Sequence, residues 1–222
     1  MAFEKKLIDQ PLMRNVIADL AVEAEAALAL TLRIGRAMDE AEDDEEAAAL
    51  ARIATPVGKY WNCKRAPGHT FEALECLGGP GYIEESMMPR LYREAPVNSV
   101  WEGSGNIMCL DILRAMFRTE AAMPAFLSEL DAARGANVTL DTATNALKDE
   151  LADSNDLELR ARGITEMMAT ALQGALLVQH APAAVADAFC ASRLGSHWTG
   201  TYGVLPAGVD FDVIIDRIAP EL

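Results

Sequence analysis

The stretch LMRNVIADLAVEAEAALALTLRIGRAM, residues 12–38, indicates the fold class of this chain. Mostly apolar side chains recur along it every three or four residues. This spacing places the recurring side chains on one side of an α-helix. The sequence therefore predicts one long amphipathic helix that begins near Asp9–Pro11 and runs to about Met38. The recurring positions are Leu12, Val16, Leu20, Ala24, Ala27, Thr31, Ile34 and Met38.

The rest of the chain has a similar character. Ala and Leu are abundant, Phe, Trp and Tyr make up 6% of the 222 residues, and runs of β-branched residues are scarce. This composition favours an all-α protein of one large or two small domains, with a boundary near residue 122. Pro56 is expected to kink the second helix. Further helices are expected at about residues 43–64, 69–77, 89–94, 106–117, 124–133, 141–152, 157–179, 183–194 and 211–218.

The charge balance limits the partners that this chain can have. The net charge is −15, and residues 123–222 alone carry six Lys/Arg against fourteen Asp/Glu. Nucleic-acid binding depends on clustered cations, so direct DNA binding by an exposed face is disfavoured. The segment Asp39–Glu46 holds seven acids in eight residues. A cation site is one interpretation, but a solvated helix start, where negative charge favours the helix dipole, is the simpler one.

The remaining titratable residues do not indicate a metal site. Cys63, Cys76, Cys109 and Cys190 form no CxxC pair, and the three histidines have no metal-ligand spacing. Reduced thiols in a cytoplasmic protein are the expected arrangement. The most apolar segment, Ala169–Ala191, is too often interrupted by polar residues to span a bilayer.

The stretch VWEGSGN, residues 100–106, places a single carboxylate at the start of an apolar helix. Burial against Trp101 would raise the pKa of Glu102 and make it a useful base. Gly103 and Gly105 allow a flat ligand or another backbone to come close, and Ser104 can cap the helix, whose first turn suits an anion. The residues leave two interpretations open: a catalytic site, or a helix cap beside a surface acid.

A second glycine-rich turn, GGPGY at residues 78–82, follows the predicted helix at 69–77. Paired glycines offer backbone N–H groups, so a pyrophosphate contact is conceivable. Most such turns are only turns, and this one is not the GxGxxG pattern that follows a strand.

These two motifs carry a resemblance to a known family. ALECLGGPGYIEESMMPRLYREAPVNSVWEGSGNIMCLDILRAM, residues 73–116, resembles the C-terminal domain of acyl-CoA dehydrogenases, and residues 1–20 resemble that family's stretch containing AFGK. EESMMPRLYREAPVNSVWEGSGN and GALLVQHAPAAVADAFCASRLG are closer to one branch, the AidB-like flavoproteins of the adaptive response to alkylation damage. The resemblance implies a four-helix bundle over residues 1–122 and a helical extension over residues 123–222.

The resemblance also implies roles for individual residues. Glu102 corresponds to the base that removes the α-proton of an acyl-CoA thioester while the β-hydrogen leaves as hydride to FAD. Gly78 and Gly79 correspond to backbone contacts with the FAD of a neighbouring subunit. Phe3 and Gln10 correspond to residues that hold the cofactor's adenosine and pyrophosphate across that interface, and tetramers are usual in the family. The segment along the FAD corresponds to Val100, Trp101, Gly103, Ser104, Gly105, Asn106, Ile107, Met108, Cys109 and Leu110.

This sequence departs from the family pattern in several places. Glu75 stands where Gln is usual, and Glu4 replaces a usual Gly. Neither an N-terminal helical domain nor a middle β-domain is recognisable. We therefore expect a C-terminal half that binds FAD weakly and turns over no acyl-CoA until other domains complete it.

The alternative is a non-catalytic module for oligomerisation or DNA protection. The distribution of the basic residues after residue 122 would distinguish the two readings, since DNA protection requires them to converge on one face. These residues are Arg134, Lys148, Arg160, Arg162, Arg193 and Arg217.

Overall fold

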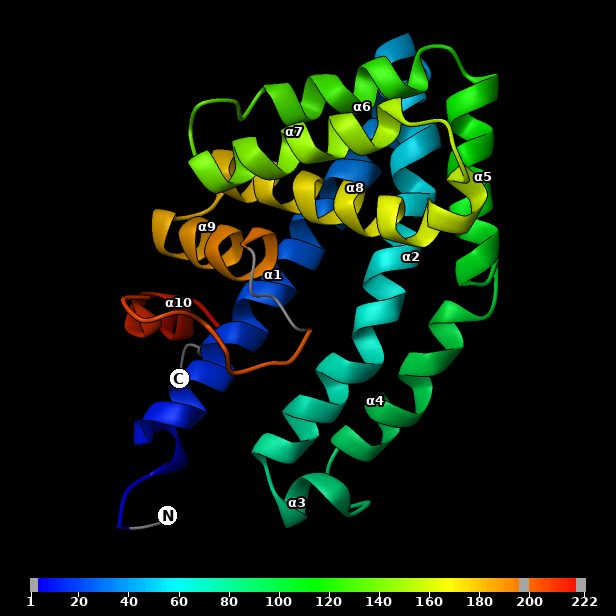
Figure 1. Cartoon of the computed structure of the whole chain (residues 1–222). Coiled ribbons are helices and arrows are strands. Elements are labelled where there is room, and N and C mark those ends of the chain that lie inside the picture. Colours follow the sequence, from blue (N-terminus) through cyan, green and yellow to red (C-terminus); the bar gives the residue numbers. More distant parts are fainter. Residues whose placement is uncertain (1–3, 196–199, 219–222) are drawn as a thin grey trace.

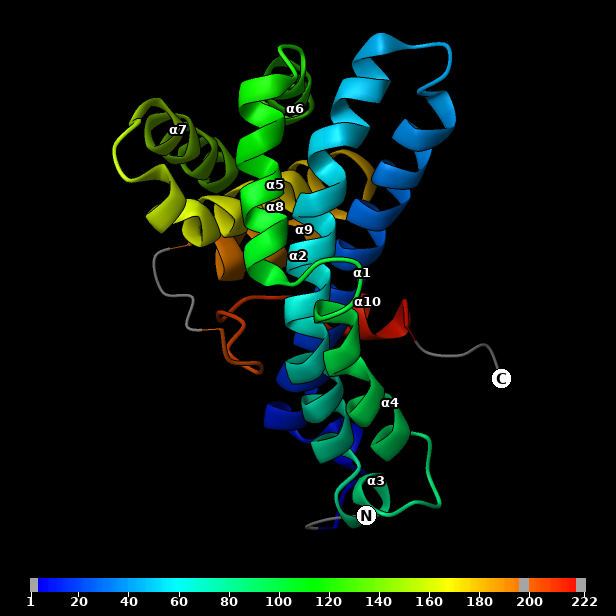
Figure 2. The ribbon, with the colours of Figure 1, turned by 90° about the vertical axis from the view of Figure 1, so that its right-hand side faces the viewer.

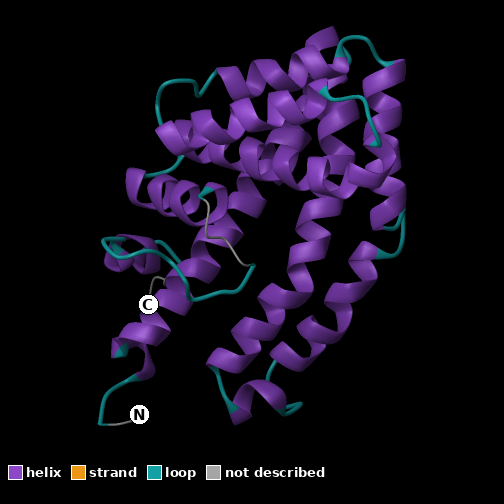
Figure 3. Cartoon of the chain, in the orientation of Figure 1, coloured by secondary structure: helices purple, strands orange, loops and turns teal. Residues whose placement is uncertain are grey.

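The computed structural model describes residues 4–195 and 200–218, and over these residues it consists of helices and loops without a strand (Figure 3). The predicted all-α class is therefore confirmed. The elements are η1 (Leu7–Asp9), α1 (Pro11–Glu40), α2 (Glu45–Cys76), α3 (Gly79–Tyr82), α4 (Met88–Glu94), η2 (Ala95–Ser99), α5 (Gly105–Arg118), α6 (Ala122–Asp131), α7 (Val138–Ala152), α8 (Leu157–His180), α9 (Ala183–Phe189), the π-helical turn η3 (Cys190–Leu194) and α10 (Phe211–Asp216).

Helix α1 has the predicted bounds but not the predicted inner face. It begins with a proline at its first position, where the missing N–H costs nothing. Leu12 is 81% exposed and Met38 is 55% exposed, although both belong to the predicted stripe. The side chains that lie fully inside are offset from that stripe. The apolar ones are Ala18, Val22, Ala26, Leu30 and Ala37, and Asp19 is buried with them.

Helix α2 is one continuous helix, so the prediction of separate helices at 43–64 and 69–77 was wrong. Both Pro56 and Pro67 lie inside it, and each removes one backbone hydrogen bond. The helix nevertheless persists because it packs against α1, α4, α5, α6 and α8 (Figure 1). Burial along this length outweighs the local cost of two prolines.

The turn after α2 and the helices that follow it have the predicted order. Gly78 has a φ of 63° and ends α2, as the paired glycines predicted. Helices α4 and α5 lie within a residue or two of the expected ranges. Between them, η2 occupies residues 95–99, where the sequence predicted no helix.

Helices α6 and α8 pack against α2 and α5, α8 and α9 pack against α1, and α7 packs against α8 (Figures 1 and 2). One buried cluster includes Ile53 and Ile112 from the first part of the chain and Phe126 and Leu172 from the second, each no more than 1% exposed. Residues on both sides of position 122 therefore share a core. The division into domains 1–122 and 123–222 stays a prediction.

A buried ionic cluster attaches the last part of the chain to the first two helices. Arg193 of η3 binds both Asp19 and Glu23 of α1, and the Glu23 carboxylate also accepts hydrogen bonds of 3.0 and 3.2 Å from Arg65 of α2. Asp19 accepts a 2.8 Å hydrogen bond from the backbone N–H of Gly203. Two carboxylates and two guanidinium groups thus balance in the interior, as buried charges require.

Candidate functional site

Glu102 lies in an exposed turn between η2 and α5. The carbonyl of Val97 accepts hydrogen bonds from the N–H groups of Val100 (2.9 Å) and Trp101 (3.2 Å), which starts the turn. Glu102 then adopts a φ of 54° and Gly103 a φ of 115°. A left-handed conformation at a glutamate is uncommon, and such positions cluster at functional sites.

The side chain of Lys59, on α2, holds this turn through hydrogen bonds to its backbone. Its ammonium group donates to the carbonyls of Asn98 (2.5 Å), Trp101 (2.9 Å) and Gly103 (3.2 Å), which lie on either side of Glu102. All three N–H donors of the lysine are thus used. The sequence analysis did not identify this residue. The only indication in the sequence was a single cation between Gly58 and Tyr60, and the structure shows both of these neighbours to be buried.

The start of α5 differs from the prediction at one residue. Ser104 is the N-cap residue, but its side chain makes no capping hydrogen bond, so the predicted side-chain cap was wrong. Gly105 is buried against α2. A Cβ atom there would lie 2.9 Å from Lys64 Cε and 3.3 Å from the Tyr60 ring, so the glycine permits close packing of the two helices.

The predicted cofactor segment presents one apolar surface outward. Val100 is 65% exposed, Trp101 60%, Ile107 53% and Leu110 37%. Cys109 points inward, and burial raises the pKa of its thiol. We call these four exposed side chains, which lie within eleven residues of sequence, the outward apolar patch. Exposed apolar side chains concentrated in this way favour a covering ligand or domain.

The other predicted contact residues lie elsewhere. Gly78 and Gly79 are exposed and sit at the α3 end of the molecule, near the N-terminal end of α1 (Figures 1 and 2). Gln10 is the N-cap residue of α1, and Phe3 lies outside the described residues. The structure does not bring Gln10, Gly78 and Gly79 together with Glu102, which follows the far end of α4 and η2. The resemblance likewise assigned the two groups to different FAD molecules.

One departure from the family pattern has a structural consequence. Glu4, which replaces a usual glycine, has a φ of 65°. A glycine adopts this conformation without the steric cost that a glutamate meets.

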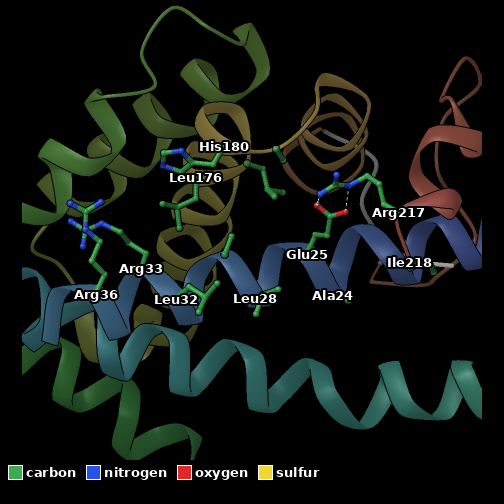
Figure 4. Close-up of a pocket in the computed structure, with 13 residues that line it drawn as sticks. Ala24, Glu25, Leu28, Leu32, Arg33, Arg36, Leu176, His180, Arg217 and Ile218 are labelled. Carbon is green, nitrogen blue, oxygen red and sulfur yellow. Dashed lines mark hydrogen bonds and ion pairs between the residues drawn. The ribbon is translucent and has the colours of Figure 1, made fainter. Parts of the chain in front are cut away.

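A groove of about 600 Å³ lies between α1, the end of α8 and the residues after α10, and none of the predicted site residues lines it. In Figure 4, Leu176 and His180 of α8 lie across from Leu28 and Leu32 of α1, while Arg217 pairs with Glu25. We place the candidate site at Glu102 rather than here, because the carboxylate and the strained turn are there.

The basic residues of the second half do not form a free cationic surface within the described part of the chain. Five of the six form ion pairs with carboxylates, and Arg193 is also buried. These contacts give the DNA-protection alternative no support. In addition, the helices described by the structure include none that is both long and apolar enough to cross a membrane.

Comparisons with known proteins found a matching family model and several relatives. The family model described as "Acyl-CoA dehydrogenase, C-terminal domain" matches residues 1–117. The AidB protein of Escherichia coli K12 is 41% identical over 188 residues, which are 85% of this chain and 34% of that protein. The human mitochondrial short-chain specific acyl-CoA dehydrogenase is 29% identical over 119 residues, covering 54% of this chain and 27% of its own.

A solved structure is also similar. ACDH-11 of Caenorhabditis elegans, in complex with C11-CoA, superposes with a TM-score of 0.79 at 25% identity, covering 91% of this chain and 40% of that one. The chain spans about a third of the length of the curated relatives it matches.

Proposed function

Because this chain belongs to the acyl-CoA dehydrogenase family, we propose that it supplies the C-terminal helical part, including the catalytic base, of an FAD-dependent acyl-CoA dehydrogenase of the AidB-like type. Residues 1–122 would be the family's four-helix bundle, and residues 123–222 a helical extension. The single observation that carries the proposal is the Glu102 turn, a carboxylate held in a left-handed conformation within the matched segment.

In this proposal Glu102 takes the α-proton of an acyl-CoA thioester. Its exposed position leaves the carboxylate accessible to a substrate, and Lys59 holds the backbone on both sides of it. A covering domain would desolvate the carboxylate and so raise its basicity. The bound FAD would accept the β-hydrogen as hydride, which balances the loss of the α-proton.

The residues of the Val100–Leu110 segment fit a flavin cofactor. The outward apolar patch offers a surface for a flat ring system, and Asn106 offers an exposed polar side chain next to it. Val100, Trp101, Ile107 and Leu110 would lie against the cofactor, with Gly103 and Ser104 supplying close backbone approach, while the buried Gly105 lets α5 pack closely on α2. Met108 and Cys109 would support this surface from inside.

Gly78, Gly79, Gln10 and Phe3 are proposed to contact the FAD of a neighbouring subunit. The starts of α1 and α3, which hold Gln10, Gly78 and Gly79, lie away from the turn before α5 that holds Glu102 (Figure 1), and this supports a role in a second site, which only an oligomer would complete. A homo-oligomer, a tetramer by analogy with the family, is therefore part of the proposal. Light scattering of the assembled protein tests it.

The catalytic proposal is tested in the assembled enzyme, in which this chain is completed by an N-terminal and a middle domain of the family. Anaerobic addition of acyl-CoAs of several chain lengths should bleach the visible absorbance of oxidised FAD. Glu102→Gln should abolish bleaching and keep the bound-flavin spectrum. Glu85→Gln, at an exposed glutamate on the turn between α3 and α4, is the matched control and should bleach normally. Bleaching by Glu102→Gln at the control rate would refute the role of this base.

A further inference from the structure

Most cations of this chain are already neutralised by carboxylates. Thirteen of the nineteen Lys and Arg residues form ion pairs. In a chain with a net charge of −15, a cation without a carboxylate within 4 Å is the exception. Within the described residues six have none: Lys5, Lys6, Lys59, Lys64, Arg118 and Arg162.

Three of these six converge on one short segment. Lys59 contacts the turn at Trp101 and Gly103, Lys64 lies against Gly105, and Arg162 binds Asn106. All three N–H donors of the Lys59 ammonium group bind backbone carbonyls, as described above. Lys64 and Arg162 bind no backbone carbonyl among the described residues, so they are the two cations at this segment with donors available for a ligand.

Arg162 reaches this segment from α8. Its Nε donates to Asn106 Oδ1 at 2.9 Å, and its four Nη hydrogens have no partner among the residues that the structure describes. A groove of about 540 Å³ between α5 and the start of α8 lies beside it. Asp156 and Glu158 also line this groove, but neither forms an ion pair with Arg162.

Lys64 reaches the same place from α2. Its Cε lies 2.9 Å and its Nζ 3.4 Å from the point that a Cβ atom on Gly105 would occupy. Its ammonium group makes no hydrogen bond or ion pair within the described part of the chain. Burial raises the pKa of the Cys109 thiol, while the charges of Arg162 and Lys64 both act to lower it, so the two cations influence one residue of α5.

We propose that Lys64 and Arg162 form a binding site for the phosphoryl groups of a nucleotide ligand beside Gly105 and Asn106. Two cations with free donors, one beside Gly105 and the other bound to Asn106, match the charge and the acceptor oxygens of a pyrophosphate. The assignment rests on the proposed function, in which both FAD and CoA carry a pyrophosphate group. Arg162 lies beyond the residues 1–117 that match the family domain, so the extension would contribute to the ligand site.

Inorganic pyrophosphate is the direct probe, titrated into the full chain by calorimetry at low and at physiological salt. The variant K64M/R162M should bind at least about tenfold more weakly, because two charge-assisted contacts are lost. The control R134M/K148M removes the same two charges from a pair of residues that bind Asp131, and should bind within about twofold of the parent. Both variants change exposed or half-exposed side chains, and circular dichroism checks that they fold.

Two results would overturn the proposal: no pyrophosphate binding at millimolar concentration, or equal losses in both double variants. Competition then identifies the ligand, since displacement by FAD points to the cofactor and displacement by CoA to the substrate. Displacement by neither would refute a nucleotide ligand. The titration needs no turnover, so its failure is separate from a failure of Glu102 as the base.

Discussion

Glu102 has a backbone conformation that a glutamate adopts only at a cost. Its φ of 54° is followed by a φ of 115° at Gly103, and a lysine side chain holds the carbonyls on both sides. A surface acid without a role would gain from a less strained residue at this position. The strain is therefore consistent with a carboxylate retained for chemistry, which is how we interpret it.

The strain predicts an unusual order of stability for substitutions at this residue. Glu102→Gly should be more stable than Glu102→Ala by about 1 kcal/mol, because only glycine adopts a left-handed φ freely. Denaturant unfolding of both variants measures the difference. At Glu85, which has no positive φ, alanine should be at least as stable as glycine. An alanine variant at position 102 as stable as the glycine variant would show that the turn is unstrained.

Removing the Lys59 side chain should let the turn at residues 97–104 open more readily. Lys59→Met deletes three hydrogen bonds from a charged donor, which should lower the free energy of unfolding by about 1–2 kcal/mol. Hydrogen exchange of residues 97–104 should accelerate before that of the helices. Lys64→Met, which deletes a lysine without hydrogen bonds to the described residues, should leave this exchange unchanged. Equal acceleration in both variants would contradict the role of Lys59.

At the scale of elements, two residues of the acidic run Asp39–Glu46 have defined side-chain contacts, since Glu40 pairs with Arg36 at 2.8 Å and Asp44 caps a helix. Asp44 is the N-cap of α2, and its carboxylate accepts hydrogen bonds from the N–H groups of Glu46 (2.8 Å) and Ala47 (3.2 Å). Glu45 and Glu46 then place negative charge in the first turn. The solvated helix start, rather than a cation site, accounts for these contacts.

This cap predicts different outcomes for two adjacent aspartates. Asp44→Ala should lower the free energy of unfolding by about 1 kcal/mol, the usual loss for a missing N-cap. Asp43→Ala should change it by less than about 0.5 kcal/mol, as expected for a surface residue without a capping contact. Thermal or urea unfolding of the two variants measures both changes in the free energy of unfolding. Equal effects would mean that the charge of the run, and not the cap, stabilises α2.

The positions of the helices could be predicted from the sequence better than their buried faces or the points at which one helix ends and the next begins. Periodicity gave α1 its bounds, but apolar residues lie on most sides of this helix, so the buried face depended on neighbours that a local pattern does not contain. The predicted break between the helices at 43–64 and 69–77 is absent, because packing of α2 against the surrounding helices outweighs the hydrogen bond lost at Pro67. Ser104 had the right residue type for a cap, yet its side chain makes no such bond.

At the scale of the whole molecule, the buried ionic cluster joins segments that are far apart in the sequence. Glu23 and Arg193 are 170 positions apart, and Arg65 comes from a third element. No local spacing could have predicted this pairing. The same holds for Lys59, Lys64 and Arg162, which surround the Glu102 segment from two different helices, whereas Glu102 itself was evident from a short motif.

His69, which packs edge-on against Tyr202 beside the cluster, and Glu23 within the cluster make stability depend on pH in two steps. Burial lowers the pKa of His69 from its ordinary 6.5, so the folded protein keeps this ring neutral while the unfolded chain takes up a proton. The free energy of unfolding should therefore begin to fall as the pH drops below about 6.5. Burial acts to raise the pKa of Glu23, but Arg65 and Arg193 hold it below 4.5, so its contribution is lost in more acidic solution.

Substituting the histidine separates these steps. In His69→Asn the decline between about pH 6.5 and pH 4.5 should shrink, while the acidic step remains. His180→Asn, at an exposed histidine at the end of α8, should keep both steps. Urea unfolding at several pH values measures the profiles. An unchanged profile in His69→Asn would show that this histidine does not cause the first step.

The central claim is that Glu102 removes the α-proton of an acyl-CoA thioester in the assembled enzyme. Its most direct test is the release of deuterium into water from an acyl-CoA that is deuterated at the α-carbon. We predict release by the parent enzyme and by Glu85→Gln. We predict none by Glu102→Gln, although FAD stays bound to that variant. Deuterium release by Glu102→Gln at the parental rate would contradict the claim and assign the proton transfer to another group.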